Sequence, residues 1–155
     1  MLHADAVTQT STRLAISRSD EHRLVTWLAL GALAVALSLA VLGLPTLDLH
    51  GPLHRLGIMD PFCGGTRAAR YTMLGQFALA WTYNPLGIVV VGVAFLAAAR
   101  ALVGVAFHRW INVHATWTPR LRWLLIAIAV VALVALEVRQ QSIAPLLMQT
   151  TPLAP

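Results

Sequence analysis

The stretch LVTWLALGALAVALSLAVLGL, residues 24–44, decides the fold class of this chain. It holds 21 nearly unbroken apolar residues, enough for a helix to cross a hydrocarbon core of about 30 Å. The run is too long for the apolar part of a signal peptide, and no small-residue cleavage site follows it. We therefore interpret it as a first membrane-spanning helix, ended by Gly43 and Pro45.

Two further apolar segments, residues 86–107 and 121–138, predict a second and a third span. Each follows a pair of residues that is typical of a helix start, Asn84–Pro85 in one case and Thr118–Pro119 in the other. Asn and Thr side chains cap the free N–H groups of a first turn, and proline suits the first helical position.

Residues 66–83 predict a helix that does not cross the membrane. Thr66 is a plausible N-cap, and Gly75 interrupts the segment. The segment carries Trp81 and Tyr83, which suit the headgroup level of a bilayer. The expected fold is an all-α membrane protein with three transmembrane helices plus one interfacial or re-entrant helix.

Composition supports one membrane domain, expected over residues 24–139. Of the 155 residues, 58% are hydrophobic and only 11% charged, and the mean hydropathy is +0.73. Such a chain has too few polar residues to cover the surface of a soluble domain. We expect residues 1–23 to be a polar, flexible tail and residues 140–155 a loosely ordered one.

The basic residues point to lipid rather than to nucleic acid. All eleven are arginine, and the net charge is +5. They are scattered over tails and loops without a basic face interleaved with aromatic residues, so we expect no nucleic-acid binding. Membrane lipid is the expected partner, and another membrane protein or a second copy of the chain remains an alternative.

The positions of the arginines predict an orientation. Six lie on the side of the N-terminus and four on the side of the loop that contains Cys63. Because cytoplasmic loops carry more arginine, we expect a cytoplasmic N-terminus and an extracytoplasmic Cys63 loop. The six are Arg13, Arg18, Arg23, Arg109, Arg120 and Arg122, and the four are Arg55, Arg67, Arg70 and Arg139.

The run DPFCGGTR, residues 60–67, holds the only cysteine of the chain. Cys63 lies beside a predicted helix start and near Arg67 and Arg70, a setting that favours the thiolate. A reactive thiol or a ligand is one interpretation, and a small residue buried at a tight turn is the other.

The same run has the composition of an anion site. Gly64 and Gly65 allow backbone N–H groups to converge, Thr66 caps the helix, and Arg67 and Arg70 can hold a phosphate or a carboxylate. The simpler interpretation is a turn, a cap and two interfacial arginines.

A metal site formed by His50, His54, Asp60 and Cys63 is a further alternative. Gly51–Pro52 lies between the two histidines and spoils a regular helix there. We predict no cofactor.

Two charged residues fall within the predicted spans, where ionisable groups are costly and often functional. Arg100 is nearer the side that carries His108 and can extend its side chain towards that interface. Glu137 is expected at the level of the Cys63 loop, with Arg67, Arg70 or Arg139 as its partner.

The motif DPFCGGTRA, with Gly75 and the run Asn84–Leu86 after it, resembles the bacterial membrane family called domain of unknown function 2752. That family has the pattern Cys-Pro-x-Cys-Gly-x-Thr-Arg-Ala, then Gly-Asp, then Asn-Pro-Leu. Here Asp60 replaces the first cysteine, which excludes a Cys-x-x-Cys redox pair, and Gln76 replaces the aspartate. The resemblance implies a bacterial inner membrane protein over about residues 45–140, and it implies no activity.

The sequence therefore favours a non-catalytic membrane component whose Cys63–Arg70 segment binds a lipid headgroup, an anion or a partner protein. No base–nucleophile pair can be assembled from the residues around Cys63. The alternative is a membrane enzyme, or a redox or metal protein, that uses Cys63 with Asp60 and His50 or His54.

Overall fold

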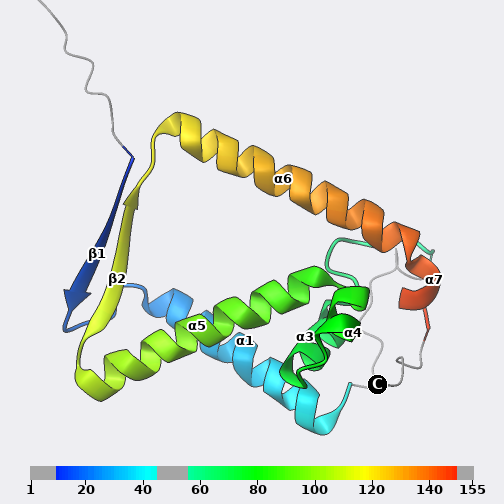
Figure 1. The fold of residues 1–155 in the computed structure, drawn as a ribbon, viewed down its shortest axis with the longest axis horizontal. Helices are drawn as coiled ribbons and strands as arrows, with labels where there is room; N and C mark the ends of the chain where they lie inside the picture. The colour runs from blue at the N-terminus through cyan, green and yellow to red at the C-terminus, as the bar shows by residue number, and fades with distance from the viewer. Residues whose placement is uncertain (1–9, 45–55, 150–155) are drawn as a thin grey trace, which may run out of the picture.

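Three long helices dominate the computed structural model, which describes residues 10–44 and 56–149 (Figure 1). They are α1 (Arg23–Leu42), α5 (Pro85–Phe107) and α6 (Pro119–Ser142). Each is long and apolar enough to cross a membrane. The prediction of a mainly helical membrane protein with three spans is confirmed.

The predicted caps begin two of these helices. The Oδ1 atom of Asn84 accepts a hydrogen bond from the N–H of Leu86 at 2.9 Å. The Oγ1 atom of Thr118 accepts one from the N–H of Leu121 at 3.3 Å. In both cases proline follows the cap and supplies the backbone angle that a first turn needs.

Two short helices replace the single helix expected over residues 66–83. They are α3 (Gly65–Met73) and α4 (Phe77–Tyr83), and both pack against α5. Gly75 lies between them with a positive φ of 73°, a conformation that favours glycine. At about 1.5 Å per residue, neither helix is long enough to cross a membrane.

A two-stranded antiparallel sheet replaces part of the flexible tail expected over residues 1–23. Strand β1 (Ser11–Ser17) pairs with β2 (Trp110–Thr116), in a register that joins Ser11 to Thr116 and Ser17 to Trp110. Residues 11–17 therefore do not form part of a flexible tail, and residues 110–116 form the partner strand between the second and third spans. The two segments satisfy each other's backbone groups, which neither could do alone.

The strands also determine where α6 lies. Helices α1 and α5 pack together, whereas β2 leads the chain away from the end of α5 to the start of α6 (Figure 1). Along its length α6 makes no extensive contact with α1 or α5, and none of its apolar window is buried within the chain. It is connected to the rest of the fold at its two ends.

The described part of the C-terminal segment is ordered, contrary to our expectation of a loose tail from residue 140. Helix α6 continues to Ser142, and α7 (Ala144–Leu147) follows. Leu147 is only 2% exposed and belongs to the main core. This core joins the loop before α3 to both short helices and α7, through Met59, Cys63, Ala68, Tyr71, Ala80, Tyr83, Ala144 and Leu147.

Candidate functional site

The three spans separate two polar regions, which we name by their main features. The turn end comprises residues 56–84 and 139–149, and the sheet end comprises residues 10–23 and 108–118. The turn end holds seven of the site residues that the sequence singled out: Asp60, Cys63, Gly64, Gly65, Thr66, Arg67 and Arg70.

At the turn end, a tight turn leads into α3. The Oδ1 atom of Asp60 accepts a hydrogen bond from the N–H of Phe62 at 2.7 Å, and its backbone oxygen accepts one from Cys63 at 3.1 Å. These bonds give Asp60 a structural role in closing the turn. The side chain of Asp60 binds only the adjacent turn among the described residues, and the residue as a whole is exposed.

Gly64 rather than Thr66 occupies the N-cap position of α3. Gly64 has a φ of 76°, and the helix begins at Gly65. Thr66 is exposed in the first turn and makes no capping hydrogen bond, so the predicted cap was wrong. A Cβ atom on Gly64 would lie 2.8 Å from a methyl group of Leu147 and 3.1 Å from the backbone oxygen of Tyr83. Conformation and space therefore both require glycine here.

Cys63 is buried under this turn. Its thiol donates to the Sδ atom of Met59 at 3.5 Å. Burial raises the pKa of Cys63, the charge of Asp60 raises it further, and the Gly64 N–H and Arg67 oppose this only in part. The expectation that the helix start and the arginines favour the thiolate was wrong, because desolvation outweighs them.

The structure does not bring together the predicted metal ligands as far as it describes them. His50 and His54 lie outside the described residues. Within the described residues, no group of three or more His, Cys, Asp and Glu side chains could hold a metal ion.

Arg67 and Arg70 point to different neighbours. The guanidinium of Arg67 lies over the ring of Tyr83, 5.3 Å from its centroid, and its Nη2 donates to the backbone oxygen of Gln149. Arg70 instead lies near the end of α1, where a Cβ atom on Gly43 would be 3.1 Å from its Nη1. The two arginines therefore do not form a single clamp.

The Nη1 atom of Arg67 is buried without a hydrogen-bond partner, and so is the Nη1 atom of Arg139. Arg139 uses its Nη2 to donate to the backbone oxygens of Trp81 and Thr82, at 2.6 and 3.2 Å. These oxygens belong to the last turn of α4, where a cation is favourable. Each guanidinium thus retains one buried donor that the described part of the chain does not use.

The two residues after Arg139 also bind the turn end. Gln140 is fully buried, and its Nε2 donates to the backbone oxygen of Tyr83 at 3.0 Å. Gln141 accepts from the N–H of Met59 and donates to the oxygen of Gly57, both at 2.9 Å. These contacts were not predicted from the sequence, where the available signal is a run of polar residues directly after an apolar span.

Asn84 is a second residue whose full role the sequence did not indicate. Besides capping α5, its Nδ2 donates to the backbone oxygens of Pro61 and Cys63, both at 2.9 Å. The side chain is fully buried and joins the turn to the start of the second span.

Glu137 does not form the expected ion pair. It is exposed, and within the described residues none of Arg67, Arg70 and Arg139 forms a salt bridge with it. Arg67 and Arg139 instead donate to backbone oxygens.

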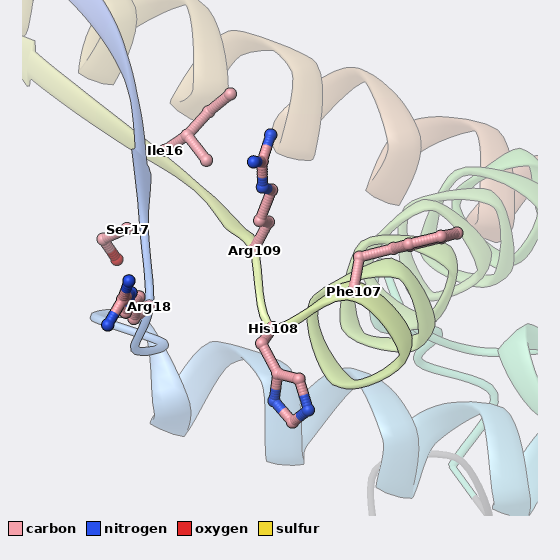
Figure 2. A pocket seen from close by; sticks show the side chains of 6 residues that line it. All are labelled: Ile16, Ser17, Arg18, Phe107, His108 and Arg109. Carbon is pink, nitrogen blue, oxygen red and sulfur yellow. The ribbon is translucent and has the colours of Figure 1, made fainter.

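The sheet end contains a hollow at the corner where the strands meet α5 (Figure 2). It has a volume of about 700 Å³ and joins an apolar recess of about 520 Å³ through shared lining residues. Arg18, His108 and Arg109 line its polar part. In Figure 2 the side chains of Arg109 and Ile16 extend to the same side, towards α6, and His108 extends away from it.

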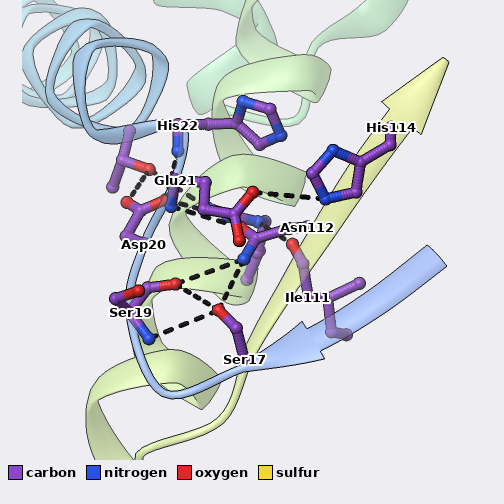
Figure 3. Close-up of polar contacts among 10 residues, drawn as sticks. Ser17, Ser19, Asp20, Glu21, His22, Ile111, Asn112 and His114 are labelled. Atoms are coloured by element: carbon purple, nitrogen blue, oxygen red, sulfur yellow. Dashed lines mark hydrogen bonds and ion pairs between the residues drawn. The ribbon is translucent and has the colours of Figure 1, made fainter. Parts of the chain in front are cut away.

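Next to this hollow, Arg100 joins three segments in a polar network. Figure 3 shows Asp20 and Asn112, two members of this network. The guanidinium of Arg100 donates to Asp20 at 2.9 Å, to Asn112 at 2.8 Å and to Thr26 at 3.1 Å. It also lies over the ring of Trp110. Arg100 does lie nearer the side of His108, as expected, but it is held by protein groups instead of extending to the interface.

Asp20 and Asn112 complete this network and were not identified from the sequence. Burial alone would raise the pKa of Asp20, but hydrogen bonds from Arg100, Thr26 and the His22 N–H outweigh it and lower that pKa to about 2. Asn112 is fully buried and donates to Ser17 at 2.7 Å.

With this geometry established, comparison with known proteins shows a similarity between part of the chain and one family. Residues 52–98 match the family model DUF2752. The model is described as a protein of unknown function, and the match confirms the resemblance to that family. No curated protein and no solved structure matches the chain. The DUF2752 segment includes the turn, α3, α4 and the first part of α5, whereas the α6 residues that bind it lie outside.

Proposed function

We propose that this chain is a non-catalytic component of a bacterial inner membrane whose Cys63–Arg70 segment binds an anionic group. A lipid headgroup, a free anion and a carboxylate of a partner protein can each supply that chemistry. The observation that carries the proposal is the Nη1 atom of Arg67, which is buried and has no hydrogen-bond partner among the described residues. A buried donor without an acceptor is costly, and an incoming oxyanion satisfies it.

The charges around Arg67 support the same proposal. Arg139 leaves a second Nη1 atom buried and unpartnered. Within the described residues, Asp60 is the acid of the turn end and Glu137 lies two residues before its second segment, and neither pairs with an arginine. The turn end therefore has an excess of positive charge that an anion can balance.

The state of Cys63 supports a binding role over a catalytic one. A nucleophilic or metal-binding cysteine needs its thiolate and access to the reactant. Cys63 is 5% exposed, and burial raises the pKa of its thiol.

The proposed orientation has a cytoplasmic sheet end and an extracytoplasmic turn end. The excess of arginine on the side of the N-terminus supports this orientation. In a Cys63→Ala background, Thr66→Cys reports the turn end and Ala115→Cys reports the sheet end, because both positions are exposed. An impermeant maleimide added to whole cells should label the Thr66→Cys variant alone. Labelling of the Ala115→Cys variant alone overturns the orientation.

The binding proposal is tested with the full chain in detergent and the variant Arg67→Gln. Native mass spectrometry is used with inorganic phosphate and with phosphatidylglycerol, and cross-linked membranes are used for protein partners. We expect Arg67→Gln to weaken binding in one of these three measurements at least roughly five-fold, which is the effect of about one charge-assisted contact.

Arg122→Gln is the matched control, because it removes an arginine from the other side of the membrane domain. Binding that is equal in wild type, Arg67→Gln and Arg122→Gln in all three arms overturns the proposal. The arm that responds identifies the source of the anion.

A further inference from the structure

The hollow at the sheet end has one polar side and one apolar side, and these meet at Arg109. The polar side is formed by Ser17, Arg18 and His108 with Arg109. The apolar recess shares Arg109 and adds Val103 and other apolar side chains. A site with this division matches an amphipathic ligand.

The cations of the hollow are available for binding. Within the part of the chain that the structure describes, neither Arg18 nor Arg109 makes a side-chain hydrogen bond or an ion pair, and both are exposed. The nearby acid Asp20 is committed to Arg100 at 2.9 Å. The positive charge of the hollow therefore lacks a counter-charge among the described residues.

The apolar side continues from the hollow along a span. Val103 and Phe107 are four residues apart on α5, so they lie on one face of the helix. Phe107 is 69% exposed and Val103 is 40% exposed. The neighbouring helix α6 does not cover them, since it makes no extensive contact with α5. An acyl chain can follow this face from the interface towards the bilayer centre.

We propose that this hollow is a specific site for an anionic glycerophospholipid. Arg109 holds the phosphate, with Arg18 at the rim, and one acyl chain lies along Phe107 and Val103. His108 ends α5 with a φ of 51° and so turns the chain sharply into β2, which places Arg109 at the corner. The side chain of Arg109 extends towards α6 (Figure 2), on the side where acyl chains must cover the unburied faces of the spans.

The site is separate from the proposed anion site at Arg67, because the two lie at opposite ends of the spans. It also needs no assumption about which end is cytoplasmic. Charge complementarity selects an anionic headgroup over a zwitterionic one, at about 1 kcal/mol per arginine near a membrane surface, which is roughly five-fold in affinity.

The experiment is native mass spectrometry of the full chain in detergent, titrated with phosphatidylglycerol or phosphatidylcholine of equal chain length. Wild type should retain one phosphatidylglycerol at least roughly five-fold more strongly than phosphatidylcholine, and Arg109→Gln should remove that preference. Phe107→Ala should weaken the binding of both lipids by a similar factor, because it removes a contact with the acyl chain and leaves Arg109 in place. Both substituted positions are exposed, so folding is not at stake.

Arg122→Gln is the control, because it removes an equal charge near the same interface without lining the hollow. Equal loss in Arg109→Gln and Arg122→Gln overturns the site, as does equal retention of the two lipids by wild type. If millimolar glycerol 3-phosphate displaces the bound phosphatidylglycerol, the proposal of a lipid site is overturned and the hollow is a simple anion site. Arg67→Gln should leave the preference unchanged, so this test and that of the turn end can fail separately.

Discussion

The guanidinium of Arg100, inside α5, lies 2.9 Å from the carboxylate of Asp20, which precedes α1. The two residues are 80 positions apart, and both side chains are mostly buried, at 20% and 7% exposed. Thr26 and Asn112 complete the contacts of the pair. The first span, the second span and the sheet are therefore joined through one cation.

Breaking this pair should destabilise the protein. We expect Asp20→Asn or Arg100→Gln to cost roughly 3 kcal/mol, because each leaves a buried charge without its partner. Thermal unfolding of the purified chain in detergent measures the effect. Glu21→Gln is the control: it removes an exposed pair with His114 and should cost under about 1 kcal/mol. Equal costs would contradict the central role of Arg100.

The same pair predicts a dependence on pH. Because the pKa of Asp20 is lowered from 3.8 to about 2 in the folded chain, its contribution is complete above about pH 4 and is lost as the pH falls through about 2. The loss amounts to about 2 kcal/mol. Unfolding measured between about pH 5 and pH 2 should show a smaller decrease for Asp20→Asn than for wild type. Parallel curves would argue against the prediction.

Cys63 should be inert in the folded protein. Its burial and raised pKa leave little accessible thiolate at neutral pH. Alkylation by iodoacetamide near neutral pH should be at least roughly ten-fold slower than in the SDS-unfolded chain. Thr66→Cys in a Cys63→Ala background provides an exposed thiol for comparison. Rapid alkylation of native Cys63 would restore the reactive-thiol hypothesis.

Alanine substitutions at three glycines distinguish the cost of a positive φ from the cost of a steric clash. Gly64→Ala meets both a positive φ and the contacts with Leu147 and Tyr83, so it should be the most destabilising of the three, at roughly 3 kcal/mol or more. Gly75→Ala meets only the positive φ and should cost roughly 1 kcal/mol. Gly31→Ala lies in a helix with open space around it and should stabilise slightly. Thermal unfolding of the three variants should give this order.

Asn84 tests the connection between the turn and the second span. Asn84→Ser keeps an N-cap oxygen but leaves the backbone oxygens of Pro61 and Cys63 without their donor. We expect a loss of roughly 2 kcal/mol from those buried acceptors. Thr118→Ala removes a cap alone and should cost about 1 kcal/mol. A smaller effect at Asn84 than at Thr118 would refute the connecting role.

The long-range contacts are what the sequence could not reveal. The spans and their caps follow from local signals, namely apolar length and the Asn84–Pro85 and Thr118–Pro119 pairs, and these predictions were confirmed. In contrast, β1 and β2 lie far apart in the chain, and each is too short for its alternation to stand out. Their pairing joins segments that no local pattern relates, on either side of α1 and α5.

At the candidate site, composition indicated the right residues but not their burial or the pKa of the thiol. Cys63 and Arg67 do lie at one turn, yet burial reverses the expected effect on the thiol, and α7 covers the place where a reactant was expected. The burial of Cys63 depends on residues 139–147, which return to the turn from the end of α6. No local pattern shows such a return.

The pairing of β1 with β2 also restricts how the chain is threaded. Paired strands share one aqueous compartment, so the polypeptide between Ser17 and Trp110 must cross the bilayer an even number of times. Helices α1 and α5 supply two passages, and α3 and α4 add no net one. The even number of crossings follows from the pairing of β1 with β2. It also means that β1, although it is translated first, can pair with β2 only after α5 has crossed the bilayer.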